Sequence, residues 1–396
     1  MRRLVFFLFL STLSCLKADE SPASSLNQAG MLAYYIIDKS SNTILSPLAI
    51  NISLMMCYEG ARGNTAKQIE NALHLSMNPS EMGKAYQELL SKLGNGIKLG
   101  SSLWVDQSTS ILPTFSQVIS EDFEGSIQKV NFKQSSQAAA TMNNWMHDYS
   151  GGKISNFVDP STLSGGTKMV LLNALVLQGA WQNPFPTQRT GMQEFQTAQG
   201  QHVNCSMMNQ VSNLYYFENE ETQIASLPLA DPHSNISFIV FLPRKKNIDP
   251  YNFYYSQDES KPEGFLSYLN MLENRMVNLT LPKFIIGQKL NLKTLFHSLG
   301  ITDALGTEGD FSGIDGTKNL FISQAMHESI LSIDEGGIYA VAASGITFSL
   351  KSSKGPEAIT MNANHPFLYA VYDFDADVLL FLGECQNPVA APEARS

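Results

Sequence analysis

One run of apolar residues sets the strongest limit on the fold. Residues 169–179 read MVLLNALVLQG, an almost unbroken apolar stretch interrupted by Asn173. A strand that is apolar at nearly every position is buried on both faces, because successive side chains point to opposite sides of a sheet. We therefore predict a central strand here, inside a sheet that other layers cover on both sides.

The spacing of apolar residues divides the rest of the chain into a helical first third and a strand-rich remainder. Helical spacing predicts helices over 25–40, 47–61, 80–93 and 136–149. A further helix is predicted to begin near Asn64, with Thr65 as its cap and Gln68 three residues later. Apolar runs predict strands over 236–242, 277–281, 367–372 and 378–382. This order, with a hairpin turn at 373–377, is typical of an α+β domain.

Composition excludes several classes of protein. The 396 residues are 43% hydrophobic and 16% charged, which argues against disorder and against a coiled coil. The net charge of −10 gives no basic surface for nucleic acid, and no basic run longer than 244–246 suggests a polyanion site. We find no dinucleotide-binding loop, P-loop, zincin motif or Gly-x-Ser-x-Gly elbow. The sequence therefore predicts neither an enzyme nor a bound cofactor or metal.

The first residues have the layout of an export signal. MRR is followed by the apolar run LVFFLFL, and the chain turns polar at Lys17. This pattern is typical of a secretory signal peptide, here 1–18, that is removed after Ala18. We therefore predict a soluble secreted protein with a single domain over 19–396. The alternative is a lipid-anchored bacterial lipoprotein, because Thr12 to Cys15 half resembles a lipoprotein box.

Covalent modification of an exported chain depends on its cysteines and sequons. Cys57, Cys205 and Cys385 remain after signal removal, and an odd number cannot form a complete set of disulfides. We predict that all three are structural thiols, with a single disulfide among them as the alternative. Sequons occur at Asn51, Asn204, Asn235 and Asn278. Asn51 lies in a predicted core helix, so we do not expect it to be modified.

One long stretch does not fit a packed domain. Residues 337–365 are small, polar and low in core-forming side chains, yet they lie between two apolar segments. Loops of this length inside compact domains are usually functional or disordered. The part from 338 to 344 is nearly all small or β-branched, so it could enter a sheet as a strand, with the preceding Gly pair as a hinge. The segment KSSKGP at 351–356 then offers a site for a protease that prefers Lys.

Short motifs occur in a fixed order along the whole mature chain. They are 42–50 (NTILSPLAI), 60–65 (GARGNT), 172–174 with 179–181 and 185, 310–314 (DFSGI), 325–327 (AMH), 365–369 (HPFLY) and 381–388. Each motif is weak alone, but the ordered set resembles the serpin family. The resemblance implies a single α+β domain with three β-sheets, about nine helices and an exposed reactive-centre loop over about 335–362.

The resemblance also implies how such a loop acts. A target protease cleaves it and forms an acyl-enzyme, and the freed loop inserts into the main sheet as a new strand, which makes the native state metastable. Family spacing places the scissile bond at Lys351–Ser352, with Leu350 and Lys354 as alternatives. A Lys there suits the acidic pocket of a trypsin-like serine protease. We therefore expect a monomer that forms a covalent complex with such a protease.

The family's hinge and sheet positions can be transferred onto this sequence. The hinge aligns with Glu335, Gly336, Gly337, Ile338, Tyr339, Ala340, Val341, Ala342, Ala343 and Ser344. The polar cluster beneath the main sheet aligns with Ser46, Asn173 and His327, and Trp181 aligns with the place where the loop first enters. Ordinary buried hydrogen bonds and a core aromatic are the simpler interpretations of these four residues.

The hinge departs from the family pattern at three positions. Gly336 replaces a charged residue, Ile338 stands where Thr or Ser is common, and Tyr339 replaces an acidic residue. Residues 336–350 contain no proline and no charge, whereas non-inhibitory serpins typically carry such residues in the hinge. The sequence therefore favours an inhibitor over a non-inhibitory carrier or chaperone.

Overall fold

The computed structural model describes residues 22–73, 75, 79–94, 96–231, 234–251, 264–339 and 358–389. Its α-helices are α2 (Pro22–Ile36), α3 (Pro47–Gly60), α4 (Gly63–Ala72), α5 (Pro79–Ser91), α6 (Pro113–Asp122), α7 (Ser135–Tyr149), α9 (Leu292–Ser298) and α10 (Ser312–Asp315). Within these ranges no helix is long and apolar enough to cross a membrane.

The strands confirm an α+β domain. They are β1 (Thr43–Leu45), β2 (Ile97–Asp106), β3 (Ser126–Val130), β4 (Met169–Leu177), β5 (Gly179–Ala180), β6 (Gly191–Gln196), β7 (His202–Glu218), β8 (Thr222–Pro228), β9 (Ile236–Pro243), β10 (Glu273–Pro282), β11 (Phe284–Asn291), β12 (Ile322–Ile333), β13 (Gly337–Ile338), β14 (Ile359–Asn362), β15 (Phe367–Asp373) and β16 (Val378–Cys385). The predicted hairpin at 373–377 joins the antiparallel strands β15 and β16.

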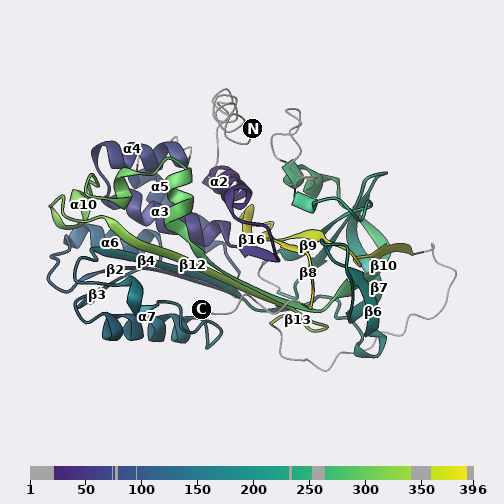
Figure 1. Ribbon diagram of the computed structural model, residues 1–396. Coiled ribbons are helices and arrows are strands. Elements are labelled where there is room, and N and C mark those ends of the chain that lie inside the picture. Colours follow the sequence, from purple (N-terminus) through teal and green to yellow (C-terminus); the bar gives the residue numbers. More distant parts are fainter. Residues whose placement is uncertain are drawn as a thin grey trace, which may run out of the picture.

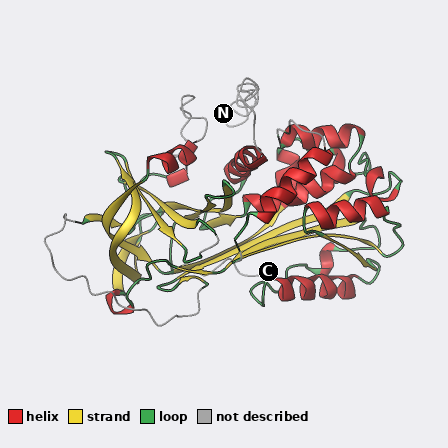
Figure 2. Cartoon of the chain, turned by 180° about the vertical axis from the view of Figure 1, so that it is seen from behind, coloured by secondary structure: helices red, strands yellow, loops and turns green. Residues whose placement is uncertain are grey.

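The predicted central strand is β4, which is buried at every position. It lies in a seven-stranded sheet of order β3-β2-β4-β12-β13-β5, in which β11 also pairs with β12. Helix α7 covers one face of this sheet, and a group of helices that includes α3 covers the other (Figure 1). The view from behind shows the same two layers on either side of the long strands (Figure 2). The apolar run at 169–179 thus has the environment that its composition requires.

The remaining strands form one nine-stranded sheet in the described part of the chain. Its order is β1-β16-β15-β9-β8-β7-β10-β14, with β6 beside β7. The 17-residue strand β7 pairs with β6 and β10 along most of its length, but its last residues pair with β8. Because this long strand belongs to both halves, two of the three predicted sheets are continuous with one another through their hydrogen bonds.

Helix α3 shows why the domain has a large core. All of its residues except Glu59 are buried, so it is apolar on every side instead of along one stripe. Ser46 caps its first turn by accepting a hydrogen bond from the Ala49 N–H at 3.2 Å, and Pro47 follows at the first helical position. The start of this helix is therefore fixed at the place where it meets the sheet.

The predicted cap at Thr65 is wrong. Helix α4 begins at Gly63 after the cap residue Arg62, whose side chain makes no capping bond. The Thr65 hydroxyl instead accepts a hydrogen bond from the Asp310 N–H at 3.0 Å. The Gln68 side chain likewise points to another segment, where its amide donates a hydrogen bond to the Asp303 carboxylate. Tertiary contacts use both side chains that the local pattern assigned to a capping box.

Both ends of the predicted loop 335–362 contain short strands. Gly337 and Ile338 form β13, and residues 359–362 form β14, which pairs in parallel with β10. Residues 340–357, with the predicted scissile bond and its alternatives, lie outside the described residues. The predicted signal peptide and Cys15 also lie outside them.

The cysteines and Asn51 behave as the sequence predicts. Cys57, Cys205 and Cys385 are buried and free, so the alternative of a disulfide among them is wrong. Burial raises the pKa of the Cys205 thiol to about 11, which makes it a poor nucleophile. The amide of Asn51 is buried and donates to the Pro47 carbonyl at 3.0 Å, so it is closed to glycosylation.

Candidate functional site: the seam of the seven-stranded sheet

The seam is the line along which β4 and β12 pair. The two strands run parallel and bond directly to each other from Met169 opposite Ile322 to Leu175 opposite Ser329. Beyond that point β13 lies next to β12, and β5 lies on the far side of β13. Two residues of the predicted hinge, which form β13, therefore lie in the sheet. Along the rest of the described seam, β4 and β12 pair directly with each other, so the seam is closed there.

A buried polar cluster crosses the seam. His327 of β12 lies opposite Asn173 of β4, and its Nδ1 makes a short hydrogen bond with the Asn173 Oδ1. The other ring nitrogen, Nε2, lies 3.0 Å from the backbone N–H of Ser46 and 2.8 Å from the hydroxyl of Ser329. The Asn173 amide donates to the Ser53 hydroxyl of α3 at 2.8 Å. The cluster thus joins both strands of the seam to the helix beneath them.

The protonation state of His327 follows from its partners. The Ser46 backbone N–H can only donate, so Nε2 has to be the acceptor and the proton lies on Nδ1. A second proton would remove this acceptor. The side chain is fully buried, and burial lowers the pKa of His327 from 6.5 to about 3. The neutral imidazole is therefore part of the closed seam.

Trp181 holds the base of the hinge. Its buried indole N–H donates to the Asp334 carbonyl at 2.8 Å, and its backbone N–H donates to the Gly336 carbonyl at 2.9 Å. The Phe185 N–H donates to the Glu335 carbonyl at 3.0 Å. Backbone groups on both sides of the hinge turn are thus bound to the segment that follows β5.

Gly337 occupies a place that no other residue fits. Its φ is +153°, and a Cβ added there would lie 2.0 Å from the Gly179 carbonyl oxygen and 2.8 Å from the Ala180 Cα. Both neighbours are backbone atoms of β5, the strand with which Gly337 pairs. Ile338 follows with no exposed surface and lies opposite Ile333 of β12. A glycine is needed so that β13 can come this close to β5.

An ion pair fixes the start of the hinge. The Glu335 Oε2 lies 2.6 Å from the Lys283 Nζ, and its Oε1 accepts from the Thr190 hydroxyl at 2.8 Å. Burial alone would raise the pKa of Glu335, but hydrogen bonds from Lys283, its own backbone and Thr190 lower it below the usual value. The carboxylate is therefore charged at neutral pH and ties the hinge to the end of β10.

The domain as a whole matches a known family. A model described as "Serpin (serine protease inhibitor)" matches residues 26–388. The chain belongs to the serpin family.

Individual serpins show the same likeness. A serine protease inhibitor of Cyanea capillata is 30% identical over 357 residues, which are 88% of this chain and 93% of that protein. Serpin B11 of Homo sapiens is 29% identical over 373 residues, with the same coverage. The crystal structure of Serpin48 from Tenebrio molitor shares 25% identity and a TM-score of 0.79, and the match covers 94% and 99% of the two chains. Serpins are generally protease inhibitors, not enzymes, and form complexes with their target proteases.

Four predicted residues of this serpin lie along the seam. Ser46, Asn173 and His327 form one bonded cluster, and Trp181 binds the hinge. Of the predicted hinge, residues 335–339 are described; 340–344 and the bond at 351–352 are not. Within the described ranges no group of three or more His, Cys, Asp or Glu side chains is placed to hold a metal ion.

Sequence reasoning missed the partners of these residues. Ser53 and Ser329 complete the cluster, and Lys283 and Thr190 bind Glu335. Ser329 could have been found, since it lies two residues from His327 and therefore on the same side of β12. No local pattern marks the others, because they come from distant parts of the chain.

We expect acid to weaken this serpin through His327. Because its folded pKa of about 3 lies below the usual 6.5, the unfolded chain takes up the proton first as the pH falls. The stabilisation is complete above about pH 6.5 and is lost towards pH 3, by at most about 1.4 kcal/mol per pH unit. Denaturant unfolding should therefore show a loss of about 2 kcal/mol between pH 7 and pH 5 from this group.

The variant His327→Gln isolates this contribution, because glutamine can accept a hydrogen bond but does not titrate. It should be less stable at pH 7 and should lose less stability than the parent between pH 7 and pH 5. Equal losses in the two proteins would show that His327 does not cause the acid sensitivity.

Proposed function

We propose that this serpin is a secreted suicide inhibitor of trypsin-like serine proteases, cleaved at Lys351–Ser352. The observation that carries the proposal is the seam, which is closed between β4 and β12 although two residues of the hinge have already entered above it. Because β13 already lies between β12 and β5, the rest of the loop could follow it as one more strand between β4 and β12. The basic and apolar start of the chain supports export.

The register of β13 supports insertion of the loop. β13 is antiparallel to both β12 and β5, whereas β4 and β12 are parallel to each other. A loop that continues β13 down the seam would replace one parallel pairing with two antiparallel ones. Antiparallel pairing is slightly more stable per residue, and a second ladder of hydrogen bonds is gained. Insertion is therefore downhill once cleavage releases the loop.

The chemical step belongs to the protease. Its serine attacks the carbonyl of Lys351, the bond to Ser352 breaks, and an ester joins Lys351 to the enzyme. Insertion of the loop then carries the attached protease along the sheet and distorts it before water can hydrolyse the ester. The serpin contributes the lysine, the loop and the free energy of insertion.

Two features of the hinge bear on the alternative of a non-inhibitory carrier or chaperone. Ile338 is bulky, but it is already buried in the core without exposed surface, so its side chain is no obstacle. No charged residue or proline follows in the sequence before Lys351. Both observations favour inhibition.

Mixing the protein with trypsin tests the proposal. We expect a covalent complex that survives a denaturing gel and contains one protease per serpin. We also expect the fraction that is cleaved without trapping to unfold at a higher temperature than the intact chain, since its loop adds a strand. A cut loop with no complex and no rise in the unfolding temperature would contradict the mechanism and favour the carrier.

A further inference from the structure

Tyr339 is held in an unusual backbone conformation at the top of the seam. It follows β13 directly and has a φ of +45°, in the left-handed region. Its N–H donates to the Ser332 carbonyl of β12 at 3.1 Å. A left-handed conformation is unfavourable for a bulky residue, so contacts that Tyr339 makes have to offset its cost.

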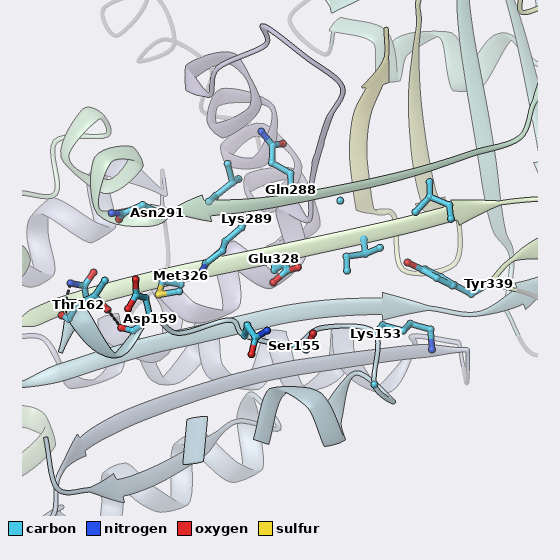
Figure 3. A pocket seen from close by; sticks show the side chains of 17 residues that line it. Lys153, Ser155, Asp159, Thr162, Gln288, Lys289, Asn291, Met326, Glu328 and Tyr339 are labelled. Carbon is cyan, nitrogen blue, oxygen red and sulfur yellow. Dashed lines mark hydrogen bonds between the residues drawn. The ribbon is translucent and has the colours of Figure 1, made fainter. Parts of the chain in front are cut away.

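Lys153 supplies such a contact. Its Nζ lies 5.2 Å from the centre of the Tyr339 ring, within the range of a cation–π interaction. Lys153 lies just after α7, on the segment that leads into β4. Figure 3 shows Lys153 and Tyr339 at the same end of a pocket of about 710 Å³ that β11, β12 and this segment line. The contact therefore joins the hinge to the segment that connects α7 to β4 in the chain.

This arrangement cannot persist when the loop inserts. A strand that continues past Ile338 requires a negative φ at Tyr339, as in any extended residue. The change from +45° rotates the backbone at Tyr339 and redirects its side chain, which separates the ring from Lys153. The contact thus stabilises the state with the loop outside the sheet and is absent once the strand grows.

We propose that Lys153 and Tyr339 form a latch that slows insertion of the reactive loop. Lys153 is a positioning residue, because it acts through Tyr339 and touches no reacting atom. The proposal rests on the suicide mechanism proposed above. In that mechanism insertion competes with hydrolysis of the acyl-enzyme, so the latch influences what fraction of the protease is released by hydrolysis instead of being trapped.

The rate of insertion can be measured without trapping a protease. The variant Ser344→Cys, prepared without residues 1–18 and so without Cys15, carries an environment-sensitive fluorophore. The native thiols Cys57, Cys205 and Cys385 are buried, so the new cysteine is the reactive one. A metalloprotease cuts the loop and forms no acyl-enzyme, so the fluorescence change reports insertion alone. The protease is used at a concentration at which cleavage is not rate-limiting.

We expect Lys153→Gln to insert about two- to fivefold faster than the parent, the range set by a partly exposed cation–π contact. Lys153→Arg keeps the cation and Tyr339→Phe keeps the ring, so both should retain the slow rate. Lys129→Gln, which removes an exposed lysine of β3 at the far edge of the same sheet, is the matched control and should change nothing.

The decisive comparison repeats the substitution Lys153→Gln in a protein that already carries Tyr339→Ala. If the two side chains act together, Lys153→Gln has no further effect once the ring is gone. Equal rates for Lys153→Gln and the parent, or an undiminished effect in the Tyr339→Ala background, would overturn the latch. A chain that inserts but does not trap trypsin would overturn the proposed function alone. No fluorescence change in any variant would overturn both.

Discussion

Replacing Lys351 with alanine should abolish the covalent complex with trypsin. The lysine ammonium is expected to pair with the acid at the base of the protease pocket, and removing one partner of a buried pair costs about 3–5 kcal/mol. That corresponds to a fall of about 10²- to 10⁴-fold in the rate of complex formation. The rate is measured from the loss of trypsin activity over time at several serpin concentrations.

Lys354→Ala is the matched control, because it removes the other lysine of the same segment. It should inhibit trypsin like the parent. Trapping that survives in Lys351→Ala and is lost in Lys354→Ala would place the scissile bond three residues later. Sequencing the fragment that cleavage releases identifies the bond directly and also covers the alternative at Leu350.

Gly337→Ala should convert the inhibitor into a substrate. The added Cβ would lie 2.0 Å from a backbone oxygen of β5, and that backbone cannot move aside like the end of a flexible side chain. The φ of +153° adds strain for any residue with a Cβ. We expect β13 to leave its place between β12 and β5, so that trypsin still cuts the loop but the strand cannot grow.

A denaturing gel distinguishes the two fates, since the variant should give cleaved serpin and free trypsin where the parent gives complex. Gly191→Ala is the control, because a Cβ there has open space around it. A single cut confined to the loop shows that the variant is folded. Undiminished trapping by Gly337→Ala would mean that insertion does not need the pairing of β13 with β5.

The parts of the fold that follow from local pattern were predictable. The apolar run at 169–179 marks β4, because only a doubly covered strand has no polar face. The continuity of two of the sheets through β7 in the described residues was not predictable, since it depends on which neighbours this long strand meets at each end. Thr65 shows the same limit on a smaller scale: its hydroxyl is used by a residue 245 positions away.

The candidate site divides in a similar way. The motifs identified Asn173 and His327, which are register partners across the seam. Nothing in the sequence links Ser53 to Asn173 or Lys153 to Tyr339, because each contact joins segments that only the folded topology brings together. The left-handed φ of Tyr339 was also hidden, since a tyrosine gives no local signal for it.

The pairing of β1 with β16 constrains when this domain can be completed on the ribosome. Thr43 lies opposite Glu384, and the Tyr369 hydroxyl donates to the Thr43 carbonyl at 3.0 Å. β16 (Val378–Cys385) is translated long after β1 (Thr43–Leu45), yet it lies between β1 and β15. β1 therefore has no ladder partner until residues 378–385 have also emerged from the ribosome. Native pairing of β1 is consequently a late event in the folding of this domain.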